Sequence, residues 1–236
     1  MKKKIMISCL IIIILIVGIC FMYLCTGNYK ASSNINKFLK STDTVKVEKI
    51  NEGYFFDGPG EETAIIFYPG AKVEYTSYAR LMYLIAENGK DCFLIKMPFN
   101  MAIFGTNKAK VIISKYNYDN YYLSGHSLGG AMANLYVSNN PDNIKGIIAL
   151  ASYSTKYIPI NIKYISIYGS NDQILNKKKY EENKKYLPED YIEYVIDGGN
   201  HAYFGNYGKQ KGDGSSTITN DEQQDYVVKV LNELGI

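Results

Sequence analysis

The 236-residue sequence is poor in the side chains that metal and redox centres need. It has two histidines and four cysteines, and Cys9, Cys20 and Cys25 all lie near the N-terminus. Cys92 is therefore alone in the rest of the chain, which excludes a disulfide within the main domain. With so few ligands, no cluster at zinc-binding spacing can form, and we expect no metal and no metal-bound cofactor.

Positive charge is also scarce away from the N-terminus. Lys and Arg together number 26 against 23 Asp and Glu, and Lys2, Lys3 and Lys4 account for the whole excess. Arg80 is the only arginine. Because binding to a phosphate backbone needs a concentrated basic face, nucleic acid is not expected as a partner. The dinucleotide-binding and P-loop glycine motifs are absent too, so no nucleotide cofactor is expected.

One long apolar run occupies residues 5–25 and is interrupted only by Ser8 and the cysteines. A helix of this length reaches across a ~30 Å hydrocarbon core. We therefore predict a single-pass transmembrane anchor at residues 1–27. The preceding lysines are expected to hold the N-terminus in the cytoplasm, which would place the rest of the chain on the extracytoplasmic side of the cell membrane.

Two alternatives to an uncleaved anchor remain open. A cleaved signal peptide normally has a shorter apolar region and a small-x-small cleavage site, which Tyr-Leu-Cys-Thr-Gly at 23–27 does not provide. Lipid attachment at Cys20 or Cys25 is the other alternative, and the bulky Ile19 and Leu24 before these cysteines disfavour it. The length of the run favours an anchor that is retained.

Beyond a polar linker at 28–43, residues 44–236 read as one domain in which apolar strands alternate with helices. Strands are predicted at 63–68, 92–96, 120–124, 146–150, 164–168 and 191–196, and helices near 75–88, 107–116, 128–139, 176–187 and 220–234. Alternating strands and helices predict an α/β fold with a mostly parallel central sheet and helices on both faces.

The strongest chemical motif is Gly125-His126-Ser127-Leu128-Gly129, which lies between a predicted strand and a predicted helix. This is the pattern of a nucleophile elbow, a tight turn that presents a serine above the edge of a sheet. The glycines are needed because the turn brings backbone atoms too close for side chains. Ser127 is therefore the candidate nucleophile, at the helix end that favours developing negative charge.

A serine nucleophile needs a base, and the sequence offers two histidines. His126 stands beside the nucleophile in the elbow, and its side chain is expected to point away from the serine oxygen. His201 follows the last predicted strand in a loop rich in glycine. We therefore predict that His201 is the general base.

The third member of a catalytic triad should be a carboxylate between the serine and the histidine in chain order. Asp172 follows the strand at 164–168 and fits this position, where it would orient the imidazole and stabilise its charged form. Asp197 is the rival, although its place before a glycine pair is more typical of a turn. Asp213 and Asp221 come after the histidine and break the order.

Two backbone groups are predicted to form the oxyanion hole. One is the N–H of Leu128, directly after the nucleophile, and the other is the N–H of Ala71, in the loop after the strand at 63–68. The connection between the strands at 146–150 and 164–168 has only about a dozen residues, including Pro159, so no sizeable lid is expected.

Five motifs are distinctive: Tyr-Pro-Gly-Ala-Lys-Val at 68–73, Lys-Met-Pro-Phe-Asn at 96–100, the elbow, Ser-Ile-Tyr-Gly-Ser-Asn-Asp at 166–172 and Gly-Gly-Asn-His-Ala-Tyr-Phe-Gly at 198–205. Together they resemble a bacterial subgroup of α/β hydrolases related to the dienelactone hydrolases. The resemblance covers roughly residues 50–236 and implies the α/β-hydrolase fold and cleavage of an ester or similar acyl bond. Dienelactone hydrolases proper use cysteine where this sequence has Ser127.

The sequence therefore predicts a serine hydrolase that acts on a small acyl substrate without a cofactor. Acyl transfer to an acceptor other than water would use the same residues and stays an alternative. A catalytically silent binding protein is a further alternative, since a fold alone does not determine function. A silent descendant would be expected to have lost Ser127, Asp172 or His201, and all three are present.

Overall fold

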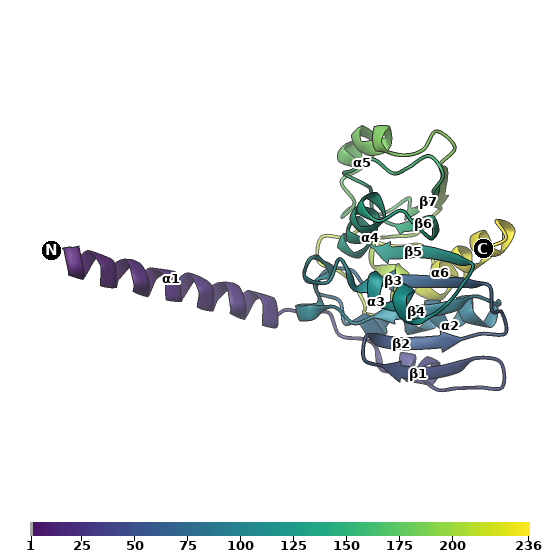
Figure 1. Cartoon of the computed structure of the whole chain (residues 1–236), viewed down its shortest axis with the longest axis horizontal. Coiled ribbons are helices and arrows are strands. Elements are labelled where there is room, and N and C mark those ends of the chain that lie inside the picture. The colour runs from purple at the N-terminus through teal and green to yellow at the C-terminus, as the bar shows by residue number, and fades with distance from the viewer. Residues whose placement is uncertain (1) are drawn as a thin grey trace.

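An eight-stranded sheet with helices on both faces forms the body of the molecule in the computed structural model (Figure 1). The structure describes residues 2–236, without the side chains of residues 2–5, 7, 8, 20 and 23, so the roles predicted for Lys2–Lys4 and Cys20 lie outside the described side chains. The strands are β1 (Lys46–Ile50), β2 (Gly53–Asp57), β3 (Thr63–Tyr68), β4 (Asp91–Ile95), β5 (Asn120–His126), β6 (Ile144–Leu150), β7 (Lys163–Gly169) and β8 (Ile192–Ile196).

The strands lie in the order β1-β2-β4-β3-β5-β6-β7-β8. The β1–β2 and β2–β4 pairs are antiparallel, and all pairs from β4 to β8 are parallel. The carboxyl ends of the parallel strands therefore meet along one edge of the sheet. In open α/β sheets this edge is where ligands bind.

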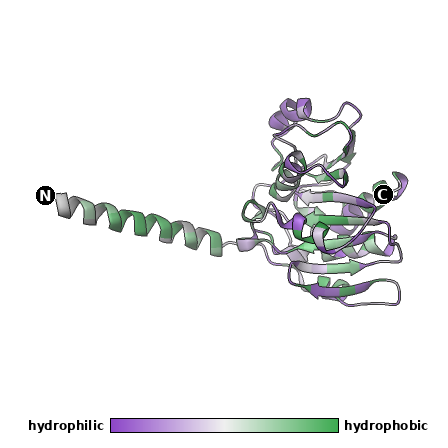
Figure 2. Ribbon diagram, viewed as in Figure 1, coloured by the Kyte–Doolittle hydropathy of each residue, from purple (hydrophilic) through white to green (hydrophobic). Residues whose placement is uncertain are grey.

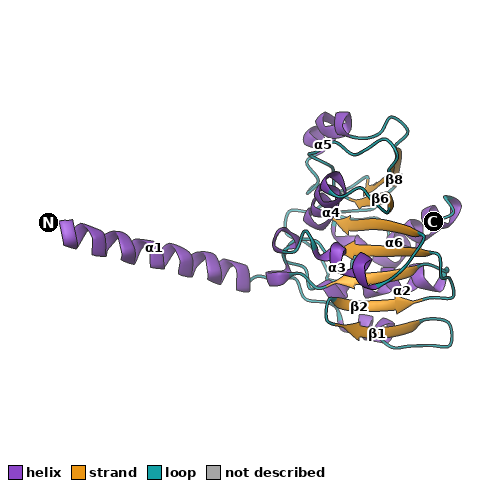
Figure 3. Cartoon of the chain, viewed as in Figure 1, coloured by secondary structure: helices purple, strands orange, loops and turns teal. Residues whose placement is uncertain are grey.

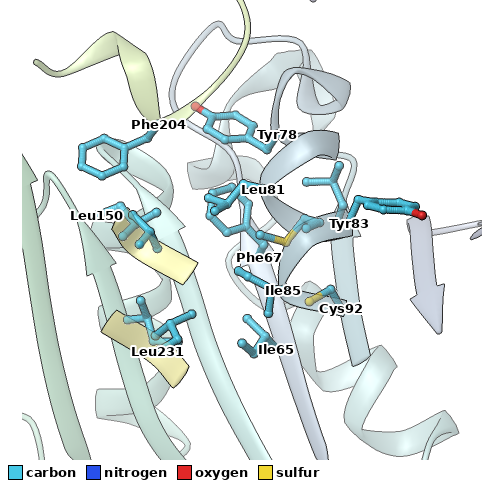
Figure 4. Packing of buried hydrophobic residues seen from close by; sticks show 14 of the residues in the cluster. Ile65, Phe67, Tyr78, Leu81, Tyr83, Ile85, Cys92, Leu150, Phe204 and Leu231 are labelled. Carbon is cyan, nitrogen blue, oxygen red and sulfur yellow. The ribbon is translucent and has the colours of Figure 1, made fainter. Parts of the chain in front are cut away.

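The two faces of the sheet are covered by different helices. Helices α2 (Ala79–Glu87) and α6 (Asn220–Glu233) pack with Ile65 and Phe67 of β3 on one face (Figure 4). Helices α3 (Lys108–Lys115) and α4 (Leu128–Asn139) pack with the alternate residues Ala64, Ile66 and Tyr68 on the other. Successive strand residues point to opposite faces, so a strand buried on both sides must be apolar throughout. The central strands are accordingly hydrophobic, whereas the peripheral α5 (Lys177–Asn183) is hydrophilic (Figure 2).

The α/β fold class predicted from the sequence is confirmed, and the predicted strands coincide with β3 to β8 to within two residues. The sequence prediction missed the antiparallel pair β1 and β2 at one end of the sheet. β1 reads Lys-Val-Glu-Lys-Ile, is mostly exposed and has no helix between it and β2. Alternation of strands with helices therefore gave no signal there.

The segment predicted as a linker, residues 28–43, packs onto the domain. Tyr29 pairs with the strand-like segment at Val73 through backbone hydrogen bonds of 2.7 and 2.9 Å. Ile35, in a short 3₁₀ helix at Ser33–Leu39, is buried, and the Ser32 N–H donates to the carbonyl of Asn206 (2.8 Å). The polar composition of the segment concealed these few anchoring contacts.

Helix α1 (Lys2–Cys25) projects away from the domain (Figure 1). Among the residues that the structure describes, no helix is both long enough and apolar enough to cross a membrane. This finding does not support the transmembrane anchor predicted for residues 1–27.

The connection between β6 and β7, residues 151–162, contains no helix (Figure 3). It passes from the carboxyl end of β6 to the amino end of β7 as turns, bends and irregular chain, and the side chains of Tyr157 and Ile160 are exposed. The prediction that no sizeable lid is inserted at this point is therefore confirmed.

Candidate active site

The turn between β5 and α4 holds Ser127 in a strained backbone conformation. Its φ of 53° and ψ of −123° lie outside the regions that non-glycine residues favour. A hydrogen bond from the Ser127 N–H to the carbonyl of Leu150 on β6 (2.9 Å) helps to keep it there. A Cβ on Gly125 would lie 2.6 Å from the Gly129 carbonyl carbon, so only glycine permits this approach. A strained, partly exposed serine between a strand and a helix is typical of a nucleophile elbow.

His201 and Asp172 meet at the carboxyl edge of the same sheet, after β8 and β7. The His201 Nδ1 lies 2.8 Å from Asp172 Oδ2, and both residues are buried. The other carboxylate oxygen accepts hydrogen bonds of 2.8 Å from the N–H groups of Ile174 and Leu175. The carboxylate is therefore fixed on both sides, and it in turn fixes the plane of the imidazole. With Nδ1 committed to the carboxylate, Nε2 is the nitrogen left for proton transfer.

Ser127 and His201 line one cavity of about 250 Å³ at this edge. No hydrogen-bond partner for His201 Nε2 occurs in the part of the chain that the structure describes. The remaining lining is a mixture of apolar, hydroxyl and amide side chains: Leu128, Ala131, Ala151, Ser152, Tyr153, Thr155, Ile174, Leu175 and Asn176. Such a cavity suits a small, mainly apolar group with a few polar atoms.

The two predicted oxyanion donors stand in segments that contact each other. Leu128 is the first residue of α4, and Ala71 lies in the loop after β3. A Cβ on Gly129 would be 2.1 Å from the carbonyl oxygen of Tyr68, so α4 begins directly against this loop. The N–H of Gly70 donates to the hydroxyl of Tyr78 (3.2 Å) and is therefore committed. The residues described provide no hydrogen-bond acceptor for the Ala71 N–H.

A family model described as "Alpha/beta hydrolase family" matches residues 64–225, a range that contains Ser127, Asp172 and His201. The chain belongs to the alpha/beta hydrolase family. No curated protein matches its sequence.

Solved structures share the fold of this alpha/beta hydrolase at low sequence identity. Alpha/beta hydrolase domain-containing protein 10 from mouse has a TM-score of 0.58 and 12% identity, covering 81% of this chain and 100% of that one. An alpha/beta hydrolase enzyme from the metagenome of lagoon sediments at Mar Chica, Morocco, has a TM-score of 0.58 and 18% identity, covering 82% of this chain and 100% of that one. A laboratory-evolved variant of a potato epoxide hydrolase has a TM-score of 0.58 and 12% identity, covering 80% of this chain and 100% of that one. At these identities the likeness concerns the fold alone.

Asp197, the rival carboxylate, is exposed and does not reach the base. Its nearest recorded partner is the Ser170 hydroxyl, which donates to Oδ1 at 3.5 Å. Asp197 lies in the turn that follows β8 in this hydrolase. Of the two carboxylates considered, the fold brings only Asp172 to the imidazole of His201.

Asp213 is a site residue that reasoning from the sequence missed. Its Oδ2 accepts from the Ala202 N–H (2.9 Å), and its Oδ1 accepts from the N–H groups of His201 (3.3 Å) and Gly214 (2.8 Å). It therefore holds the backbone of the histidine loop from outside the triad. The Asp213-Gly214 dipeptide, which is typical of a turn, was the available signal for this role. Chain order excluded Asp213 as a triad member and gave no indication that it holds the loop.

The elbow histidine of this hydrolase is buried behind the site. His126 Nδ1 lies 2.8 Å from the Tyr78 hydroxyl, and the His126 and His201 rings are 4.5 Å apart between centroids. Burial holds the pKa of His126 well below its ordinary value, the proximity of His201 lowers it further, and a backbone contact with His201 acts in the opposite direction. His126 is therefore neutral at pH 7.

Proposed function

We propose that this alpha/beta hydrolase cleaves an ester or similar acyl bond through a covalent acyl-enzyme on Ser127. The observation that carries the proposal is the buried contact between His201 and Asp172, which leaves His201 Nε2 without a partner in the described chain, in the cavity that Ser127 also lines. A nucleophile, a base and a residue that orients the base are the parts that acyl transfer by a serine needs.

In the proposed reaction, Ser127 Oγ attacks the carbonyl carbon while its proton passes to His201 Nε2. The carbonyl oxygen becomes an oxyanion, which the N–H groups of Leu128 and Ala71 would stabilise. Collapse of this intermediate breaks the bond to the leaving group, which takes the proton from His201. Water then attacks the acyl-enzyme with His201 again as base, and the acid product and free Ser127 are released. Asp172 keeps the imidazole in the tautomer that each step requires.

The serine at the elbow also bears on the proposed subgroup. The motifs of the chain resemble those of hydrolases related to the dienelactone hydrolases, and a serine replaces their cysteine. Serine depends on an adjacent base more strongly than cysteine does, because a hydroxyl is far less acidic than a thiol. The tight His201–Asp172 contact fits a site built around serine.

A fluorophosphonate probe, which phosphonylates activated serines, tests the proposal. The wild-type protein should be labelled, and Ser127→Ala should not be labelled or hydrolyse p-nitrophenyl acetate. Ser124→Ala is the matched control, because Ser124 is a buried serine on β5, the strand before the elbow, and its hydroxyl donates to the Ile148 carbonyl (3.0 Å). It should keep its label. Labelling that persists in Ser127→Ala would refute the assignment.

A further inference from the structure

A buried hydroxyl joins the loop after β3 to the nucleophile elbow. The Tyr78 hydroxyl accepts a hydrogen bond from the Gly70 N–H (3.2 Å) and lies 2.8 Å from His126 Nδ1. Both Tyr78 and His126 are almost completely buried. Gly70 precedes the predicted oxyanion donor Ala71, and His126 precedes the predicted nucleophile Ser127. The Tyr78–His126 pair thus links the two segments that must cooperate on the oxyanion.

The direction of these hydrogen bonds follows from the protonation of His126. A neutral imidazole has one N–H, and the pKa of His126 is held well below its ordinary value by burial. His126 Nδ1 lies 2.8 Å from the Tyr78 hydroxyl, and in the tautomer that is protonated on Nε2 it can accept the Tyr78 proton. In that tautomer the phenol accepts from the Gly70 N–H and donates to Nδ1.

The pair also touches the loop that carries the base. The rings of His126 and Phe204 lie 5.5 Å apart, and a Cβ on Gly205 would be 3.1 Å from the Tyr78 ring. The Tyr78 hydroxyl points towards Phe204 (Figure 4). The N–H of Asn206 donates to the carbonyl of Ser77 (2.7 Å), which fastens the same loop to the residue before Tyr78.

The backbone at Gly70 has little room to move, because the Tyr78–His126 pair lies directly against it. A Cβ at Gly70 would lie 2.8 Å from His126 Nδ1 and 2.9 Å from the Tyr78 hydroxyl. The backbone of the loop is therefore pressed against the pair, with its amide held by the phenol. An oxyanion donor must point at the place where charge develops, and a shift of a few tenths of an ångström weakens it.

We propose that the Tyr78–His126 pair is a positioning element that sets the loop 69–72 relative to Ser127 and so aligns the Ala71 N–H with the oxyanion. This inference rests on the proposed function. Neither side chain touches the substrate or moves a proton in the reaction. Both act through the backbone that they hold.

Tyr78→Phe removes the hydroxyl and leaves the ring in place. Loss of a whole oxyanion donor lowers kcat about 100-fold to 1000-fold in serine hydrolases, so a misaligned donor should lower it by about 10-fold to 100-fold. KM should stay within about twofold, because the oxyanion forms only in the transition state. The Ki of a trifluoromethyl ketone, which forms a tetrahedral adduct with the serine, should rise by the same factor as kcat falls.

Tyr83→Phe is the matched control. Tyr83 is a mostly buried tyrosine of the same helical segment, and its hydroxyl shares a hydrogen bond with Thr42 Oγ1 (2.7 Å) on the side away from Phe204 (Figure 4). Removal of the Tyr83 hydroxyl should lower the stability of the protein, with kcat within about twofold of wild type.

Two variants of His126 test the other half of the pair. His126→Asn keeps an acceptor near the position of Nδ1, whereas His126→Leu removes it. We expect the asparagine variant to retain most of the wild-type kcat, and we expect kcat of the leucine variant to fall as much as that of Tyr78→Phe.

The possible outcomes separate this inference from the proposed function. An active wild-type protein whose kcat is unchanged by Tyr78→Phe would overturn the inference and leave the proposed function standing. An equal loss of kcat in Tyr83→Phe, or in the asparagine and leucine variants of His126, would show a general effect of folding and would also overturn it. If the wild-type protein showed neither labelling by the probe nor esterase activity, both the proposed function and this inference would be refuted.

Discussion

His201 and Asp172 come from loops 29 residues apart in the chain, yet their side chains meet at 2.8 Å inside the protein. Two further hydrogen bonds, from the N–H groups of Ile174 and Leu175, hold the other oxygen of the carboxylate. A buried carboxylate with every oxygen occupied is stable because its partners replace the water that it has lost. The contact gives the imidazole a fixed plane and a fixed tautomer.

Asp172→Asn should lower kcat by about 1000-fold to 10,000-fold, because an amide in place of the carboxylate favours the wrong tautomer of His201. Asp197→Asn is the matched control and should change kcat by less than about twofold, since Asp197 is exposed and contacts the Ser170 hydroxyl only at 3.5 Å. Initial rates with p-nitrophenyl acetate measure both. The reverse ranking would show that the carboxylate is wrongly assigned.

Asp213→Asn should loosen the histidine loop. The amide would present an N–H group to backbone donors that now bind the carboxylate, among them the N–H of Ala202 (2.9 Å). We expect a loss of about 1–3 kcal/mol in the free energy of unfolding, together with a lower kcat. Asp221→Asn is the control, because its ion pair with Arg80 is mostly exposed on the aspartate side and such pairs contribute about 0–1 kcal/mol. Urea unfolding followed by circular dichroism compares the two, and equal losses would contradict the prediction.

The buried His126 should make folding sensitive to acid. Its pKa is lowered in the folded protein by burial and by His201, while the unfolded chain takes up a proton near the ordinary pKa of about 6.5. The unfolded state then binds more protons, so this contribution to stability is present above about pH 6.5 and is lost as the pH falls below it. Around His126 lie the Tyr78 hydroxyl, the His201 imidazole and the uncharged Phe204 ring.

Between pH 7 and pH 5 the free energy of unfolding should fall by up to about 2 kcal/mol on account of His126. His126→Asn, which cannot take up a proton, should lack this part of the dependence. Urea unfolding of both proteins at the two pH values gives, for each protein, the change in the free energy of unfolding with pH. The difference between the two changes is the contribution of His126. Parallel curves for the two proteins would mean that folded His126 is protonated as readily as in the unfolded chain.

Short acyl esters should be hydrolysed at least as well as long ones. The cavity at Ser127 is about 250 Å³, and the connection 151–162 builds no helical lid that could cover a long chain. An acyl chain that stays in water gains none of the ~0.8 kcal/mol that burial of each methylene would contribute. Comparing kcat/KM for p-nitrophenyl acetate, butyrate and palmitate tests this. A strong preference for palmitate would show that the protein binds the chain elsewhere.

The sequence by itself determined the fold class and the order of the candidate residues. Apolar strands alternating with helices leave a parallel sheet as the arrangement that buries them, and the glycines around Ser127 permit the tight turn that presents it. An inventory with two histidines also narrowed the choice of base to His201. These are local constraints, and a pattern of neighbours along the chain is enough to reveal them.

Only the tertiary structure decided which distant groups meet. The hold of Asp213 on the histidine loop, the packing of the segment 28–43 and the pairing of Tyr78 with His126 all join residues far apart in sequence. Their partners are backbone amides or single side chains in loops, which have no periodicity that a sequence pattern could display. Such contacts depend on how the loops converge at the carboxyl edge of the sheet, and that convergence exists only after the sheet has formed.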